Sequence, residues 1–164
     1  MPLIPEDGTG FANADSLASL EFANQYHLDR GNDRWQVMSV SRREQKLRQA
    51  TDYIKYIFGP SFAGAKVFPN QSQPFPRYVN GVNIGLPMAI QEAVAELALI
   101  ADTTPLMPNQ TTARRKSIKI GPIEVQYDAN PFTGPRFVSA TSRLGEFLSG
   151  FSTAAVRTAT VVRT

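Results

Sequence analysis

One stretch, residues 41–58, constrains the fold more than any other, because a start signal, a helical period and a stop signal coincide in it. Ser41 followed by Glu44 has the pattern of a capping box, in which each side chain binds the backbone N–H of the other residue. The pattern predicts a helix that begins at Arg42. Gly59-Pro60 is a stop signal, because glycine accepts a left-handed cap and proline lacks the N–H that would continue the helix.

The two faces of this predicted helix differ sharply. Apolar residues recur at spacings of three and four, which places them on one stripe that must pack against the rest of the chain. They are Leu47, Ala50, Ile54, Ile57 and Phe58. The opposite face is basic and carries Arg42, Arg43, Lys46, Arg48 and Lys55.

Two further helices are predicted. Ser19 is a suitable N-cap for a helix over residues 20–30, and Gly31 is a suitable C′ residue. Pro87 fits the first position of a helix over residues 88–101, in which Ile90, Val94, Leu97 and Ala98 or Ala101 face inward. Trp35, in the link before residue 41, is expected to fold back onto the core as a large anchor.

The remaining segments carry loop and strand signals. Residues 59–87 hold five prolines among glycines and asparagines, which predicts a long irregular loop. Alternating apolar residues on both sides of Gly121-Pro122 predict a small β-hairpin. The expected fold is therefore mainly α: a small bundle of three to four helices with a long irregular loop and a small β-hairpin.

Two parts of the chain are expected to differ in role. Residues 1–130 form the helical domain with its hairpin, and residues 131–164 form a C-terminal extension that docks on a partner. The extension carries closely spaced apolar residues among Ser, Thr and Gly, so it is expected to lie outside the core of the subunit. The alternative is that residues 137–148 form a fourth core helix that covers the hairpin.

Composition bounds the class of protein. A chain of 164 residues with 42% hydrophobic content fits one domain, and the absence of cysteine excludes disulfides and thiolate metal sites. No apolar run has the length of a membrane span and no signal peptide is recognisable, so a soluble protein made in a cytoplasm is expected. Residues 1–29 hold five acidic and no Lys or Arg residues, whereas residues 30–55 hold seven basic and three acidic ones. Such polarity suits head-to-tail contacts between subunits or a surface that faces nucleic acid, although scattered solvated charge is an equal alternative.

The sequence offers little for catalysis. His27 is the only histidine, and it is expected to be a structural residue at a helix surface. Glu92 and Glu96 lie one turn apart and could share a metal, but such pairs are usually the solvated face of a helix. No phosphate-binding loop or catalytic triad can be assembled. We therefore expect no enzyme, no metal and no cofactor.

The order of short motifs resembles one family as a whole. The matching motifs are Glu6-Asp7-Gly8-Thr9-Gly10, Ala14-Asp15-Ser16, Ala23-Asn24-Gln25-Tyr26-His27, Arg30-Gly31-Asn32, Trp35, Arg48-Gln49-Ala50-Thr51-Asp52-Tyr53-Ile54, Phe62-Ala63-Gly64, Gln73-Pro74-Phe75-Pro76-Arg77 and Leu86-Pro87 with the helix after it. Over residues 4–128 the chain is similar to head-tail connector (adaptor) proteins of tailed phages, which are also labelled DnaT-like single-stranded-DNA-binding proteins.

This resemblance implies a structural virion protein at the phage neck, assembled in the host cytoplasm. Such a subunit forms a ring, typically twelve-fold, between the portal protein and a tail or neck protein, and the ring continues the channel through which double-stranded DNA passes. Candidate residues for the DNA channel are Arg42, Arg43, Lys46, Arg114, Arg115 and Lys116, which could equally face solvent or acidic groups of a neighbouring subunit. Candidate residues for portal docking are Phe137, Arg143, Leu144, Phe147, Leu148, Phe151 and Arg157.

The alternative function is a single-stranded-DNA-binding accessory protein. Such a protein needs aromatic side chains interleaved with basic ones on one exposed surface. Tyr53 and Tyr56 beside Lys55, and Tyr78 after Arg77, are the candidates that the sequence offers.

Overall fold

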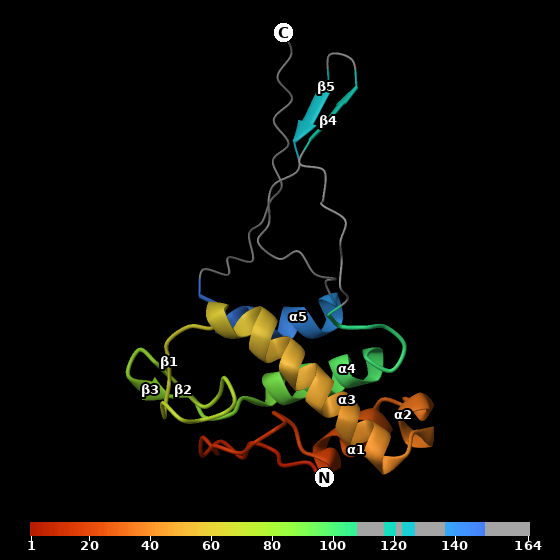
Figure 1. The fold of residues 1–164 in the computed structure, drawn as a ribbon, viewed down its shortest axis with the longest axis vertical. Helices are drawn as coiled ribbons and strands as arrows, with labels where there is room; N and C mark the ends of the chain where they lie inside the picture. The colour runs from red at the N-terminus through yellow and green to blue at the C-terminus, as the bar shows by residue number, and fades with distance from the viewer. Residues whose placement is uncertain (108–116, 121–122, 127–136, 150–164) are drawn as a thin grey trace.

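The computed structural model describes residues 1–107, 117–120, 123–126 and 137–149 (Figure 1). In these ranges the chain is mainly helical, as expected, but it has five α-helices where three to four were predicted, and it also has a small three-stranded antiparallel sheet. The helices are α1 (Leu20–Asp29), α2 (Asp33–Val37), α3 (Val40–Tyr53), α4 (Met88–Ile100) and α5 (Val138–Leu144). The strands of the sheet are β1 (Ala65–Lys66), β2 (Arg77–Val79) and β3 (Val82–Asn83). None of the helices in these ranges is long and apolar enough to cross a membrane.

Helix α1 has the two ends that its sequence predicts. The side chain of Ser19 accepts a hydrogen bond from the backbone N–H of Phe22, which identifies Ser19 as the N-cap. Gly31 has a φ of +63°, and the N–H groups of Gly31 and Asn32 donate to the carbonyls of Leu28 and His27. This pair of bonds is a Schellman motif, which satisfies carbonyls at the end of the helix.

Helix α3 begins earlier than its capping box predicts. Its N-cap is Ser39, whose side chain accepts from the N–H of Arg42, so the start at Arg42 with Ser41 as cap is wrong. The reason is a competing N-cap, because Ser39 has the extended backbone that an N-cap needs. The carboxylate of Glu44 instead accepts a hydrogen bond from the N–H of Leu3, at 3.3 Å. Glu44 therefore anchors the N-terminal arm.

The other end of α3 also differs in detail. The helix continues as a π-helical turn, η1 (Ile54–Phe58), and then as a 3-10 turn, η2 (Gly59–Ser61). Gly59 has φ −47° and ψ −47°, so the predicted left-handed cap at this glycine is wrong. Pro60 occupies the second position of the 3-10 turn, where its missing N–H costs no intrahelical hydrogen bond.

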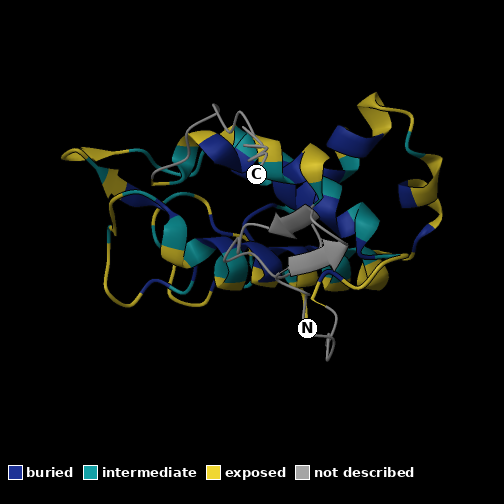
Figure 2. Cartoon of the chain, turned by 90° about the horizontal axis from the view of Figure 1, so that it is seen from above, coloured by how far each residue is buried: buried dark blue, intermediate teal, exposed yellow. Residues whose placement is uncertain are grey.

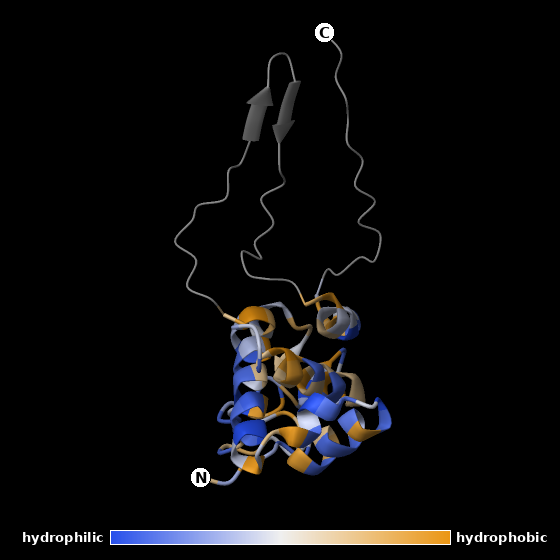
Figure 3. Cartoon of the chain, turned by 90° about the vertical axis from the view of Figure 1, so that its right-hand side faces the viewer, coloured by the Kyte–Doolittle hydropathy of each residue, from blue (hydrophilic) through white to orange (hydrophobic). Residues whose placement is uncertain are grey.

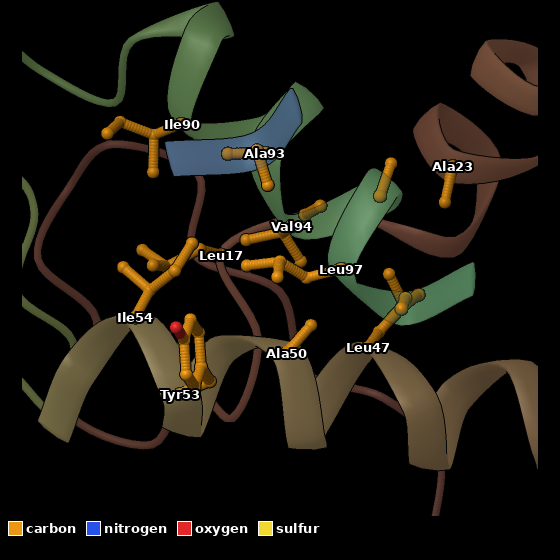
Figure 4. Packing of buried hydrophobic residues seen from close by; sticks show 14 of the residues in the cluster. Leu17, Ala23, Leu47, Ala50, Tyr53, Ile54, Ile90, Ala93, Val94 and Leu97 are labelled. Carbon is orange, nitrogen blue, oxygen red and sulfur yellow. The ribbon is translucent and has the colours of Figure 1, made fainter. Parts of the chain in front are cut away.

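The core lies where α3 and α4 face each other. Leu47 and Ala50 of α3, with Ile54 at the start of η1, are completely buried and point toward Val94 and Leu97 of α4, as Figure 4 shows. The inward face of α4 is the predicted one, but Pro87 is its N-cap and not its first residue. In Figure 2 the buried residues lie where the elements face one another, and the exposed residues lie on the outside. Figure 3 shows hydrophobic and hydrophilic residues alternating along single helices.

Trp35 and His27 extend this core under the short helix α2. Trp35 is completely buried, as predicted, and its indole N–H donates to Asn24 at 2.9 Å. The His27 ring lies 4.5 Å from the indole, between centroids, and is completely buried too. The expectation of a surface position for His27 is therefore wrong. Its role is still structural, because the ring packs on Trp35 inside the core.

The loop over residues 59–87 is irregular for most of its length, but it contains a hairpin that the proline content concealed. Strand β2 pairs with β1 through Ala65↔Tyr78 and with β3 through Val79↔Val82, all antiparallel. Asn80 and Gly81 form the turn with φ of +51° and +81°, the conformation that Asn-Gly favours in a two-residue hairpin.

The predicted second hairpin is confirmed as a strand pair. Strands β4 (Ser117–Ile120) and β5 (Ile123–Gln126) are antiparallel, with Ile118 opposite Val125 and Ile120 opposite Ile123. The register places the connection at Gly121-Pro122, as the sequence indicates.

Helix α5 belongs to the helical body, where it packs against α4 (Figure 1). Ala140 and Leu144 are completely buried within it, and a 3-10 turn, η3 (Gly145–Phe147), follows. The expectation that this segment lies outside the core is therefore wrong for residues 137–148, and the alternative of a fourth core helix is supported. The local sequence concealed this, because the helix is only seven residues long and is stabilised by what it packs on.

Candidate nucleic-acid interface

Two arginines meet on one carboxylate where α2, α3 and α4 come together. Nε and Nη2 of Arg34 bind Oδ2 of Asp102, at 3.1 and 3.0 Å. Nε and Nη2 of Arg42 lie 2.7 and 2.6 Å from Oδ1 of the same residue. The Asp102 side chain is only 6% exposed, whereas the arginines remain 53% and 54% exposed.

The electrostatics of this site favour an ionised Asp102. Burial of the carboxyl raises its pKa, but the hydrogen bonds and positive charges of Arg42 and Arg34 outweigh burial and hold the pKa below 3.8. The carboxylate is therefore charged near neutral pH. One negative charge cannot balance two guanidiniums, and their exposed parts keep unused donors and charge.

Two more basic residues, Arg43 and Lys46, lie within four positions of Arg42 on α3. Nζ of Lys46 donates to the carbonyl of Ala101 at 2.9 Å, which places a positive charge at the negative end of α4. Arg43 is held by the carbonyls of Met38 and Gln36, both at 2.9 Å, and by Asn24 at 2.8 Å. We call Arg34, Arg42, Arg43 and Lys46, with Asp102, the Asp102 cluster.

Within the Asp102 cluster the members have different roles. Arg43 and Lys46 bind backbone carbonyls, so part of their function is to stabilise the fold. Arg34 and Arg42 bind a side chain and keep most of their surface in solvent. The predicted channel residues Arg42, Arg43 and Lys46 thus gather at one end of the helical body, whereas Arg114, Arg115 and Lys116 lie outside the described residues.

The candidates for a single-strand surface are separated by the fold. Tyr53 is only 2% exposed, and Arg77 is buried among the carbonyls of Phe62, Ala63, Gly64 and Pro74 at 2.6 to 3.2 Å. Tyr56 remains 61% exposed, and Nζ of Lys55 lies 5.5 Å from the centre of its ring. Tyr78 is 46% exposed but lies on the small sheet.

The candidates for portal docking lie within the subunit as far as they are described. The ring of Phe137 packs on Tyr53 at 5.6 Å, and the ring of Phe147 packs on Phe75 at 5.9 Å, between centroids. Leu144 is buried, and Leu148 forms a β-bridge with Phe62. Phe151 and Arg157 lie outside the described residues.

Arg143 is part of a polar network and not a free docking group. Its guanidinium pairs with Glu92 at 3.2 Å and with Glu96 at 3.8 Å, and its Nη2 donates to the hydroxyl of Tyr26 at 3.2 Å. The two carboxylates that could have shared a metal are therefore occupied with Arg143 and Tyr26. In the ranges that the structure describes, no three His, Cys, Asp or Glu side chains are grouped as a metal site needs.

Fold and site together define a small, mainly helical protein with a cationic cluster at one end. A family model described as "Putative DnaT-like ssDNA binding protein" matches residues 1–163. Because the match covers nearly the whole chain, the protein belongs to this family of DnaT-like ssDNA binding proteins. No curated protein and no solved structure matches the chain.

Sequence reasoning missed Arg34 and Asp102 as parts of the cluster. Arg34 stands in a segment that reads as a link, and Asp102 is 60 residues away from Arg42 along the chain. Only the packing of α4 against α3 brings them together. The excess of basic residues within residues 30–55 was the signal that could have located this site, and it indicated the correct part of the chain.

Proposed function

We propose that the protein binds single-stranded DNA without sequence preference, with the Asp102 cluster contacting phosphate groups. The observation that carries this proposal is the pair of half-exposed guanidiniums that share one carboxylate. A guanidinium has five N–H donors in a fork that suits phosphate oxygens, and Asp102 occupies only part of each fork. The family description, which names single-stranded DNA, supports the same ligand.

The chemistry of the cluster predicts the kind of binding. Charge neutralisation of phosphates releases counterions, so affinity should fall steeply with salt. The cluster holds no aromatic side chain or amide that reads base edges, so it supports sequence-independent binding.

Fluorescence anisotropy with a labelled oligothymidylate over a series of salt concentrations tests the proposal. Arg42→Gln should weaken binding and reduce the slope of log affinity against log salt by about 0.7 for each phosphate that is no longer neutralised. The matched control is Arg30→Gln, which removes an exposed arginine at the C-cap of α1, outside the Asp102 cluster. Equal effects of the two variants would show that only net charge matters, and would exclude the Asp102 cluster as the site.

A second variant, which should strengthen binding instead of weakening it, makes the test more specific. Asp102→Asn keeps the size of the side chain and removes its charge, so it should free both guanidiniums and tighten binding. Circular dichroism should show an intact fold in this variant. Weaker binding by a folded Asp102→Asn protein would contradict a role of Arg34 and Arg42 as phosphate ligands.

A second candidate function is the ring at the phage neck, with the portal and a tail or neck protein as partners and double-stranded DNA in its channel. The observation that favours it is the presence of exposed apolar side chains at both ends of the body: Val37 (82%) and Val40 (55%) at one end, Tyr56 (61%) and Val82 (63%) at the other. Ring contacts join two unlike surfaces of the same subunit, and two separate apolar surfaces meet that need.

Negative-stain imaging and mass photometry, with and without portal protein, test the ring. A closed ring on the portal would support it, and a monomer that does not bind the portal would contradict it. Val37→Asp should prevent ring formation without unfolding the subunit, because this side chain is largely exposed. Comparing single-stranded with duplex oligonucleotides separates the two candidates, since a channel lining needs no preference for single strands.

A further inference from the structure

The outer face of α3, continued by the π-helical turn η1, forms an exposed line from the Asp102 cluster to Tyr56. Arg42, Gln45, Gln49, Asp52 and Tyr56 are all exposed and follow one another at intervals of three and four residues. That spacing places them on one face of the helix, opposite the buried Leu47 and Ile54. At 1.5 Å of rise per residue, the α-helical part from Arg42 to Asp52 is about 15 Å long, and Tyr56 follows in η1.

The far end of this line has what the Asp102 cluster lacks, an exposed aromatic ring. Tyr56 is 61% exposed although its neighbours Ile54 and Phe58 are buried. Lys55 lies beside it, with Nζ 5.5 Å from the ring centre. A flat ring next to a cation is the combination on which a base can stack while its phosphate is neutralised.

The middle of the line is polar. The side-chain oxygen of Gln49 accepts a hydrogen bond from Nζ of Lys46 at 3.1 Å, which leaves its amide N–H groups to donate outward. Asp52 is the acidic member of the line, and its charge opposes a phosphate. Burial raises the pKa of Asp52, and the positive charge of Lys55 opposes this shift.

We infer that a single strand of DNA lies along the outer face of α3, with phosphates at Arg42 and a base stacked on Tyr56. This inference rests on the proposed function and extends it from one cluster to a path. Duplex DNA keeps its bases inside, so the Tyr56 end would distinguish a single strand from a duplex. Asp52 lies between the two ends and weakens the binding.

Oligothymidylates of about 4 to about 16 nucleotides, the range of site sizes of single-strand-binding folds, provide the test. Tyr56→Leu should weaken binding of the longer strands by about fivefold or more, the loss expected for one stacked base. Tyr56→Phe keeps the ring and should bind as the wild type does. The comparison variant is Tyr78→Leu, which removes a tyrosine that is 46% exposed on the small sheet and belongs to neither α3 nor η1. Asp52→Asn should tighten binding.

The outcomes separate this inference from the proposed function. If Arg42→Gln weakens binding while Tyr56→Leu and Tyr78→Leu behave alike, the path along α3 is wrong and the Asp102 cluster stands alone as the site. Equal affinity of the wild type for duplex and single strand would also overturn the stacking of a base on Tyr56. If the wild type binds no oligonucleotide at low salt, the proposed function fails, and the path with it.

Discussion

The hydroxyl of Tyr26 in α1 donates a 2.6 Å hydrogen bond to the carboxylate of Glu96 in α4, and Arg143 of α5 joins both. Burial raises the pKa of Tyr26 to about 12, with Glu96 as a further cause, so the phenol remains protonated and keeps donating. The network connects three helices at one point. It fixes the position of α5, but its charged side chains, Arg143, Glu92 and Glu96, are 22–27% exposed, which limits the stability that their ion pairs can supply.

The attachment of α5 should therefore depend more on Leu144 than on Arg143. Leu144→Ala removes a completely buried side chain and should lower the free energy of unfolding by about 2–5 kcal/mol. Arg143→Met breaks a partly exposed network and should cost about 1 kcal/mol. Urea denaturation of the two variants measures both values. A larger loss in Arg143→Met than in Leu144→Ala would contradict this ranking, and a stable chain without residues 137–164 would show that α5 is dispensable.

The contact between α3 and α4 should be the main source of stability. Ile54→Ala and Leu97→Ala each leave a cavity at a position that is completely buried, and each should cost roughly 2–5 kcal/mol. Val37→Ala is the control, because this residue is 82% exposed, and it should change stability by less than about 0.5 kcal/mol. Thermal and chemical denaturation of the three variants would test the packing.

Stability should decrease in mild acid because of His27. Its Nε2 lies 3.0 Å from the carbonyl of Ala95, which can only accept, so Nε2 carries the proton and Nδ1 accepts from the amide of Asn32 at 2.9 Å. Burial lowers the pKa of His27 from 6.5 despite the opposing effect of the Ala95 carbonyl.

The sign of this pH dependence follows from linkage. The unfolded chain binds a proton below about pH 6.5 while folded His27 is still neutral, so its contribution is complete above that pH and is lost as pH falls toward the lower pKa of the folded state. His27→Gln lacks the titrating group and can still donate to Ala95. The difference in unfolding free energy between wild type and His27→Gln should therefore change with pH, by at most about 1.4 kcal/mol per pH unit. A constant difference between pH 7 and pH 5 would be inconsistent with a buried neutral histidine.

Arg77 should be essential for the loop over residues 59–87. Its guanidinium donates to the carbonyls of Ala63, Phe62 and Gly64 at 2.8, 3.1 and 2.6 Å, and the residue is only 7% exposed. Arg77→Met fills the space but leaves these carbonyls without donors, and it should cost about 3 kcal/mol or more. Arg30→Met, at an exposed arginine, is the control. Faster proteolysis within residues 61–77 in Arg77→Met alone would identify the loop as the damaged part.

The parts of the fold that could be predicted are those with local signals. Ser19 and Gly31 mark the two ends of α1 through their own side-chain and backbone chemistry, so the sequence alone predicts where this helix begins and ends. Ser41 with Glu44 carried an equally good signal, but Ser39, two residues earlier, caps the helix instead, and Glu44 binds the N–H of Leu3. A capping pattern alone does not decide between two nearby serines that both suit an N-cap.

The candidate site, too, could be predicted only in part from the sequence. The basic face of α3 was visible as a pattern, but which residues keep their charge available depends on tertiary partners. Arg43 binds carbonyls of the preceding loop, whereas Arg42 shares a carboxylate with Arg34 of another helix. The burial of Tyr53 and the exposure of Tyr56, three residues apart, likewise follow from what packs against each side of the helix.

Two glycines of the long loop should respond in opposite ways in a saturation mutagenesis library. A Cβ at Gly64, where φ is +74°, would overlap the backbone carbonyl of Tyr78, so every substitution must force β1 and β2 apart. A Cβ at Gly59 meets no atom within 4 Å, and its backbone is helical. Sequencing of the surviving clones should therefore find codon 64 unchanged and alanine accepted at codon 59, so this one close approach sets a limit on how the loop can evolve.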